Sequence, residues 1–86
     1  MAMTIELTSH STVEITEVIE LEVGGHYCLP YAVYSLHVLN GVAWVTSQAE
    51  DHILECGDEL TIPRQPHAVI VSAVDHQPLR FEMHRR

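Results

Sequence analysis

Apolar and polar residues alternate along the first part of the chain. The odd positions of residues 13–23 read Val, Ile, Glu, Ile, Leu and Val, and most even positions hold Thr or Glu. Such a period of two is typical of a strand with one buried face. A helix is the alternative, because residues 11–14 fit a capping box and Ile15, Val18 and Ile19 would share a helical face. The strand is favoured because β-branched residues, which are stiff in helices, crowd the segment.

Two apolar segments flank Asn40-Gly41 within residues 35–46. Asn-Gly favours a two-residue type I′ turn, so the segment predicts a β-hairpin with a fixed register. The predicted pairs are Leu39 with Val42, His37 with Trp44 and Ser35 with Thr46 on one face, with Leu36, Val38, Ala43 and Val45 on the other. Both faces are then largely apolar, so the hairpin should lie between two layers or under a partner subunit.

Short apolar segments separated by turn residues continue to the end of the chain. They are residues 53–54, residues 60–62, residues 68–71 and the alternating Leu79, Phe81 and Met83. Roughly six to eight short strands without a convincing helix predict an all-β sandwich or small barrel. We expect residues 11–84 to form a single β domain, preceded by an N-terminal extension, residues 1–10, that could be flexible.

The charge balance excludes some classes of partner. The chain carries 12 acidic residues against 4 basic ones, all arginine, and has a formal charge of −8. This charge repels phosphate backbones and anionic lipids, so we expect neither nucleic acid nor membrane as a partner. No apolar run approaches the ~18 residues of a membrane helix, and we expect a cytoplasmic protein. A core this small gives modest stability, which favours a homodimer.

Cysteines and turn carboxylates give little support to catalysis. Cys28 and Cys56 are too far apart for a Cys-x-x-Cys motif, and we expect both to be ordinary buried thiols. Asp51 and Asp58 lie at predicted turns, where short carboxylates cap backbone N–H groups. No serine lies in a Gly-x-Ser-x-Gly frame, and neither cysteine has a basic neighbour. We therefore assign no catalytic residue.

One segment resembles a known signature. The sequence Leu-Glu-Cys-Gly-Asp-Glu-Leu-Thr-Ile-Pro ends at Pro63 and is followed by His67. A Gly-Asp turn leading into a strand, a proline and a histidine resembles the second signature of the cupin superfamily. The segments around Gly41 and at residues 51–54 also resemble bacterial cupin-like proteins known only as a domain of unknown function. The resemblance covers residues 19–83 and implies a small jelly-roll barrel of two antiparallel sheets.

The first cupin signature is largely missing. In catalytic cupins, a His-x-His pair and a downstream Glu join the later histidine around a metal. This chain has no His-x-His, Tyr34 stands where the resemblance places the Glu, and His26 is the upstream histidine in that region. In the second signature, Gln65 replaces a common Gly and His67 comes one position early. The resemblance therefore implies the fold more clearly than a metal site.

Seven histidines nevertheless invite a metal hypothesis, because neutral imidazole is a common transition-metal ligand. If a metal binds, the ligands would be His26, His52 and His67, with His37, Asp51 or Cys56 as further candidates. A site needs three or four convergent ligands, and no helix or Cys-x-x-Cys spacing holds these together. We expect no metal and no other cofactor.

A small-molecule site has different candidates. The predicted hairpin places His37 opposite Trp44, where it could hydrogen-bond a ligand in an apolar pocket or pack on the indole. The candidate ligand-binding residues are His37, Trp44, Tyr34 and His67.

Three functions fit these observations. The first is a metal-free cupin-like module that binds or senses a small apolar or cationic molecule. The second is a structural or protein-interaction domain whose barrel is filled by its own side chains. The third is a metal-dependent cupin enzyme of the dioxygenase or isomerase type. We rank the enzyme third.

Overall fold

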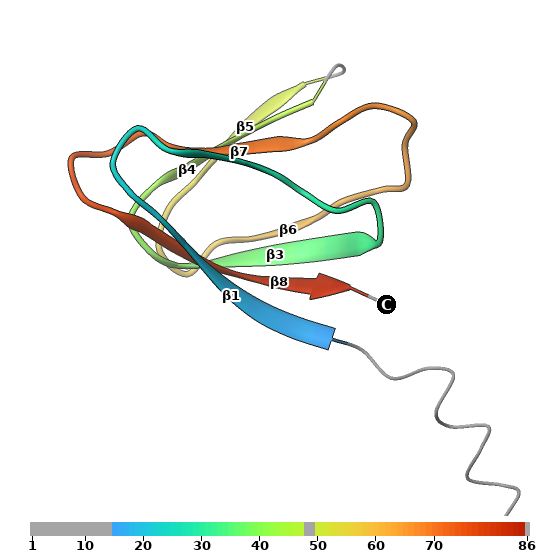
Figure 1. Ribbon diagram of the computed structural model, residues 1–86, viewed down its shortest axis with the longest axis horizontal. Coiled ribbons are helices and arrows are strands. Elements are labelled where there is room, and N and C mark those ends of the chain that lie inside the picture. The colour runs from blue at the N-terminus through green and yellow to red at the C-terminus, as the bar shows by residue number, and fades with distance from the viewer. Residues whose placement is uncertain (1–14, 48–49, 86) are drawn as a thin grey trace, which may run out of the picture.

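The computed structural model describes residues 15–47 and 50–85, so the predicted extension of residues 1–10 lies outside the described residues. The described part contains eight strands and no helix (Figure 1). It accordingly offers no helical segment of the length and apolarity that crossing a membrane demands. The strands are β1 (Ile15–Leu21), β2 (His26–Cys28), β3 (Val33–Asn40), β4 (Ala43–Thr46), β5 (Asp51–Leu54), β6 (Glu59–Thr61), β7 (Ile70–Ala73) and β8 (Leu79–Arg85).

The strands form two four-stranded antiparallel sheets that lie one above the other (Figure 1). The first sheet has the order β1-β8-β3-β6, and the second sheet has the order β2-β7-β4-β5. Within the described residues, each sheet keeps its own hydrogen-bonded ladder, so the two sheets are not closed into one barrel. The predicted all-β architecture of two antiparallel sheets is confirmed.

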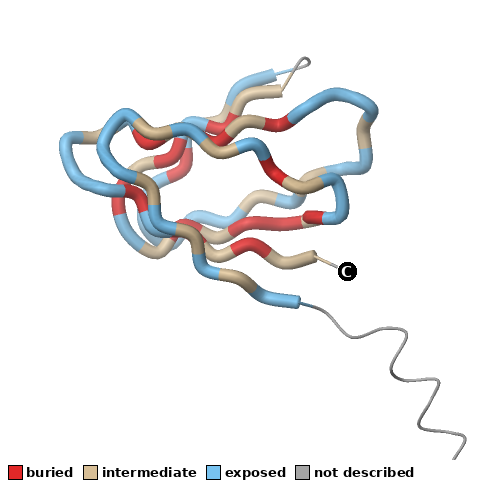
Figure 2. Tube along the Cα trace, viewed as in Figure 1, coloured by how far each residue is buried: buried red, intermediate tan, exposed pale blue. Residues whose placement is uncertain are grey.

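The hydrophobic core lies between the two sheets (Figure 2). On β8, the inward residues Leu79, Phe81 and Met83 are buried, as their predicted alternation requires. The Phe81 ring also contacts the Tyr27 ring of β2 edge to face, with centroids 6.1 Å apart, and so links the two sheets. The remaining core residues are Leu29, Val33, Leu36, Val38, Ala43, Val45, Leu54, Val69, Val71 and Ala73.

The first predicted strand is confirmed as β1, and the helical alternative is wrong. Ile19 lies opposite Phe81 of β8 and packs against the core, whereas Val18 faces outward. Glu17, which interrupts the apolar alternation, lies 2.9 Å from the Arg85 Nε atom through its Oε1 atom. The arginine therefore places an opposite charge beside Glu17 at the end of this face.

The predicted hairpin at Asn40-Gly41 is wrong. The strand before it, β3, pairs with β6 and β8 in the first sheet, and the strand after it, β4, pairs with β5 and β7 in the second. His37 therefore lies opposite Glu59 and Glu82 rather than opposite Trp44. A type I′ turn needs a positive φ at both central residues, and here only Gly41 of the pair has one, at 89°.

The chain passes from the first sheet to the second at Gly41. There it packs against the connection from β7 to β8, where the chain passes back to the first sheet. A Cβ atom on Gly41 would lie 2.7 Å from the Pro78 carbonyl oxygen, in the connection from β7 to β8. Glycine is thus required both by the positive φ and by the close approach of another backbone. The dipeptide predicted to form a hairpin turn instead lies where the β3–β4 connection packs against the β7–β8 connection.

Two smaller predictions also need correction. Cys28 and Cys56 are exposed rather than buried, because Cys28 points outward from β2 and Cys56 lies in a turn, where its thiol donates to the Leu39 carbonyl. Asp58 caps a turn as predicted, since its carboxylate accepts from the Glu55 backbone N–H at 2.8 Å. Asp51 does not lie in a turn but begins β5.

Candidate functional site

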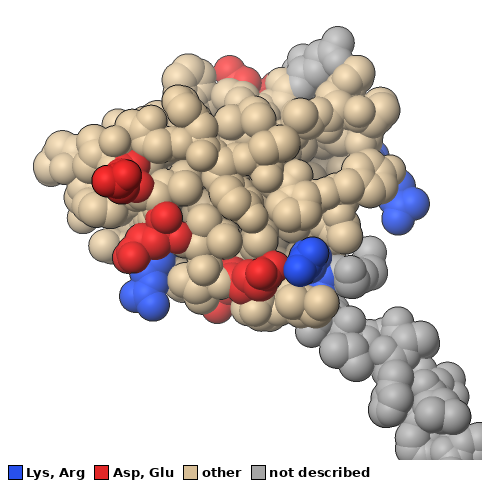
Figure 3. All heavy atoms as spheres, viewed as in Figure 1, with Lys and Arg blue, Asp and Glu red and all other residues tan. Residues whose placement is uncertain are grey.

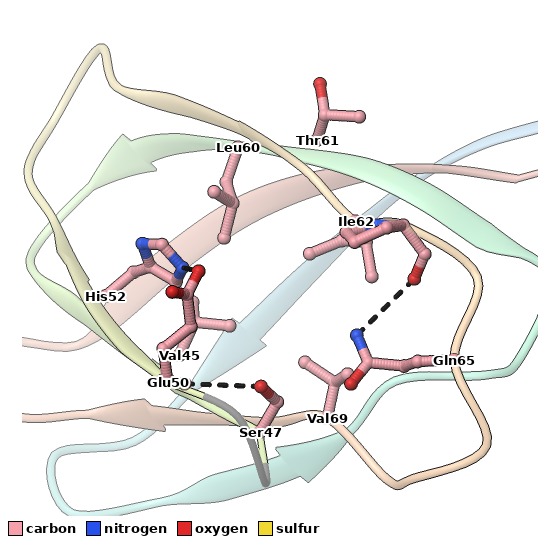
Figure 4. A pocket seen from close by; sticks show the side chains of 10 residues that line it. Val45, Ser47, Glu50, His52, Leu60, Thr61, Ile62, Gln65 and Val69 are labelled. Atoms are coloured by element: carbon pink, nitrogen blue, oxygen red, sulfur yellow. Dashed lines mark hydrogen bonds and ion pairs between the residues drawn. The ribbon is translucent and has the colours of Figure 1, made fainter.

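A pocket of about 410 Å³ opens between the edges of the two sheets. The edge strand β6 contributes from the first sheet, and β4 and β5 contribute from the second. Figure 4 shows the side chains of Leu60 and Ile62 above the pocket and those of Val45 and Val69 below it. These apolar side chains form a surface that can cover the body of a small molecule. The lining residues are Val45, Ser47, Glu50, His52, Leu60, Thr61, Ile62, Pro63, Gln65 and Val69.

An ionisable pair lies at the mouth of this pocket. The His52 Nε2 atom lies 3.0 Å from Glu50 Oε1, and because an ionised carboxylate only accepts, the imidazole donates. The side chain of Glu50 is 67% exposed and that of His52 is 38% exposed. His52 turns inward because it lies opposite the buried Val45 in the β4–β5 ladder. Strand alternation thus sets the imidazole against the apolar wall.

Two further polar groups complete the lining. The Ser47 hydroxyl donates to the Glu50 carbonyl at 3.2 Å, which fixes the chain at the start of β5. The Gln65 amide nitrogen donates to the Pro63 carbonyl at 3.4 Å, and Figure 4 shows the amide group within the pocket. The side chain of Thr61 points away from the pocket in the same view. The carboxylate and the amide oxygen thus place two hydrogen-bond acceptors in the lining.

A second hollow of about 200 Å³ adjoins the first pocket, and His67 is among its lining residues. It shares Ile62, Pro63, Gln65 and Val69 with the first pocket. Arg64 also lines it, with its guanidinium carbon 5.6 Å from the centroid of the Tyr31 ring. Tyr34 lines a smaller hollow of about 110 Å³ that also includes Arg64.

The structure does not bring the predicted ligand-binding residues into one site. Tyr34 and His67 lie near Arg64, in adjoining hollows. His37 points outward from the first sheet, with its Nδ1 atom 3.9 Å from Glu82 Oε1. Trp44 points outward from the second sheet. The two residues that the hairpin would have paired are on opposite surfaces of the protein.

The residues present do not fit the metal centre of catalytic cupins. His26 faces outward from β2, with its Nδ1 atom 2.9 Å from the Ser72 hydroxyl, whereas His52 and His67 line two different hollows. Across residues 15–47 and 50–85, no group of three or more His, Cys, Asp or Glu side chains is placed to hold a metal ion. Tyr34 also offers a phenol where the signature has a carboxylate. No chemical step is therefore derived through a metal.

Most residues of the pocket were not predicted from the sequence. Glu50, Ser47 and Gln65 were not candidates, because they come from two loops that only the folded chain brings together. His52 was considered only as a possible metal ligand, although it shares a strand face with the buried Leu54. That alternation was the available signal that His52 points toward the interior.

Comparisons with known proteins support the fold. No family model matches the sequence, and no curated protein matches it. Among solved structures, a cupin protein from Bacteroides fragilis is 20% identical with a TM-score of 0.70, covering 86% of this chain and 65% of that protein. The cupin domain of Cnp3 from Schizosaccharomyces pombe is 18% identical with a TM-score of 0.71, covering 86% and 56%.

A candidate sugar phosphate isomerase from Acidithiobacillus ferrooxidans has the same fold, at 20% identity and a TM-score of 0.66, covering 85% of this chain and 50% of that protein. This chain thus spans between 50% and 65% of the length of these three proteins. Likeness at such low identity concerns the backbone arrangement, since one fold hosts many functions. The two facing antiparallel sheets and these structural matches show that the chain has the cupin fold.

Proposed function

We propose that this protein is a metal-independent binding module for a small molecule with an apolar body and a cationic group. The ligand binds in the pocket between β4, β5 and β6. The observation that carries the proposal is the Glu50–His52 pair at the mouth of a pocket whose walls are mainly aliphatic. An apolar lining with a few convergent polar groups is the usual arrangement of a small-molecule site.

The polarity of the pocket favours a cation. The carboxylate of Glu50 uses one oxygen for His52, and its second oxygen can accept from an ammonium group. The Gln65 amide oxygen adds another acceptor, and Arg64 lines the neighbouring hollow rather than this pocket. The formal charge of −8 also raises the local concentration of cations around the protein.

Size narrows the choice of probe. The volume of about 410 Å³ lies toward the lower end of ligand pockets, which run from about 300 to 1,000 Å³. A short alkylammonium ion such as n-pentylammonium presents both required features, an aliphatic chain and a positive charge. Its neutral and anionic counterparts, 1-pentanol and pentanoate, test the two features separately.

The experiment is a titration of the isotope-labelled protein with these three probes, followed by amide chemical shifts. We expect shifts to centre on Val45, Leu60 and Val69, and the affinity order to be ammonium, then alcohol, then carboxylate. Glu50→Gln should weaken ammonium binding roughly two- to fivefold, because the carboxylate is largely exposed and screened. Pentanol binding should not change.

The matched control is Glu59→Gln, which removes a carboxylate from the outward face of β6. Ammonium binding should keep its wild-type affinity in this variant and after dialysis against EDTA. Equal affinity for all three probes, shifts centred elsewhere, or binding abolished by EDTA would contradict the proposal.

A second candidate function is supported by the filled core. The space between the centres of the sheets is occupied by Phe81, Leu36, Leu79 and Met83, which are almost entirely buried. A domain whose interior is packed in this way can act through its surfaces rather than through a cavity. Retained fold with no binding of any probe would favour this interaction function.

A further inference from the structure

The outward surface of the second sheet is unusually apolar for an exposed surface. Alternation directs Trp44, Ile53 and Ile70 outward from β4, β5 and β7. Val42 and Val74 extend the same surface, because the Val74 N–H approaches the Val42 carbonyl at 3.4 Å beyond the end of the β4–β7 ladder. We call this surface, formed by Val42, Trp44, Ile53, Ile70 and Val74, the tryptophan face.

The centre of the tryptophan face has the composition of a binding hot spot. Trp44 is 40% exposed and lies directly opposite Ile53, which is 58% exposed. Around them lie polar side chains, including Ser72, Thr46 and His26. Aromatic residues at an apolar centre with a polar surround are typical of protein interfaces. Trp44 and Ile53 would both gain burial from a partner.

The two outer faces differ in charge, and this difference indicates where a second copy of the chain can approach. Asp51 is the acidic residue among the outward positions of β2, β7, β4 and β5. The outward positions of the first sheet instead include Glu20, Glu59 and Glu82. In the view of Figure 3, acidic side chains lie along the lower part of the molecule, with arginines among them, and others lie at its left and upper edge. A chain with a formal charge of −8 can approach its own copy most closely where carboxylates are scarce.

We propose that the tryptophan face binds a second copy of this chain across a two-fold axis. The two second sheets pack face to face, so that Trp44 of one subunit covers Ile53 of the partner subunit. A face of four short strands spaced about 4.8 Å apart, with its flanking valines, gives a small contact area. This area is at the low end for specific interfaces, and the dimer dissociates reversibly on dilution.

The opposite outer face is not a comparable surface. On the first sheet, Glu82 Oε1 lies 3.3 Å from His84 Nε2 and 3.9 Å from His37 Nδ1. The Thr16 hydroxyl also lies 3.2 Å from His84 Nδ1. These polar groups contact one another and water, and burying them against a second copy would cost desolvation free energy.

Two matched variants of the full-length chain test the proposal by sedimentation velocity over a concentration series. Ile53→Glu puts a carboxylate on the tryptophan face, and Val18→Glu puts the same group on the outward face of β1, where Val18 is 47% exposed. The wild type should form dimers, Ile53→Glu should raise the dissociation constant by at least about tenfold, and Val18→Glu should leave it unchanged within about twofold. Far-UV circular dichroism establishes that both variants fold.

The single tryptophan gives a second readout that does not depend on a variant. Dilution of the wild type should move the Trp44 emission maximum to longer wavelength and increase its quenching by acrylamide, because the indole returns to water. A wild type that is monomeric at all concentrations would overturn the proposal. So would a dimer that Val18→Glu dissociates and Ile53→Glu does not, or one whose Trp44 emission is unchanged on dilution. The ligand pocket is not involved, since His52 faces inward and Ile53 outward.

Discussion

The two sheets share one interior and differ on their outer surfaces. Inside, both present buried aliphatic residues, such as Leu36 and Val38 in the first sheet and Val45 and Val71 in the second. Outside, the first sheet presents a network around Glu82, and the second presents Trp44 beside Ile53. Both sheets thus contribute to stability, whereas the proposed interaction with a second copy involves only the second sheet.

A substitution in the core between the sheets should reduce stability the most. Phe81→Ala removes the largest fully buried side chain, which also contacts Tyr27 across the sheets. We expect the free energy of unfolding to fall by about 3–5 kcal/mol, measured by urea denaturation, because the cavity cannot collapse between two rigid sheets. Folded protein with a loss below about 1 kcal/mol would show that the two sheets do not depend on this common core.

The connection between the sheets should be nearly as sensitive. Gly41→Ala combines a positive φ with a Cβ atom placed against the Pro78 carbonyl, and we expect a loss of roughly 2–4 kcal/mol in the same assay. Gly57→Ala is the control, because Gly57 has a similar φ of 93° and open space around it. It should lose only about 1–2 kcal/mol. Equal losses would mean that the contact between the crossings contributes nothing.

Removal of the outward-facing Trp44 tests whether self-association depends on the outer face of the second sheet. In calorimetry, the wild-type unfolding temperature should rise by about 5 °C between ~10 μM and ~1 mM protein, because dimer formation stabilises the folded state by mass action. Trp44→Ala should abolish that rise. His37→Ala, on the other sheet, should retain it. A rise that persists without Trp44 would place the contact elsewhere.

The polar network should contribute little by comparison. Glu82→Gln disturbs the contacts to His37 and His84, whose side chains, like that of Glu82, are partly exposed. We expect a coupling energy between Glu82 and His84 of no more than about 1 kcal/mol. It is measured from the free energies of unfolding in a double-mutant cycle of Glu82→Gln and His84→Ala. A coupling energy well above that value would make this face a structural element rather than a solvated surface.

The smallest effect concerns Asp75, in the crossing from β7 to β8. Its pKa is lowered from 3.8 because the His76 backbone N–H donates to the carboxylate at 2.8 Å and the Gln77 amide donates at 3.2 Å. Since the folded-state pKa is the lower one, the stabilisation is present above the unfolded-state pKa and is lost as pH falls through the folded-state pKa. Between these two pKa values, Asp75→Asn should show a shallower acid dependence of stability than the wild type, measured by urea denaturation. An identical acid dependence would contradict this assignment.

Strand identity was well predicted because it depends on local pattern. The alternation around Ile19 selected a strand over a helix, and the alternation of Leu79, Phe81 and Met83 gave their burial correctly. Even the mistaken hairpin assigned Leu36, Val38, Ala43 and Val45 to one face, and all four are core residues. Which side of a strand is apolar is fixed by a period of two, whatever strand lies beside it.

The candidate site was poorly predicted because it depends on pairing. The Asn-Gly signal predicted that β3 and β4 are neighbours, but β8 and β6 occupy both edges of β3. With that register lost, His37 and Trp44 were assigned to one site although they lie on opposite surfaces. Glu50 and Gln65 line the same pocket although they come from loops distant in sequence, and no local pattern indicates that arrangement.

The sequence by itself determined the strands, their inward residues and the acidic charge, because these follow from local alternation and composition. The tertiary structure decided which strands pair, where the chain crosses between sheets, and which outward residues share a surface. Those properties depend on contacts between distant segments, whose free energy is gained only when both sheets close on the core. The crossing at Gly41 is the clearest case, because a turn residue was selected there by the backbone of Pro78, far along the chain.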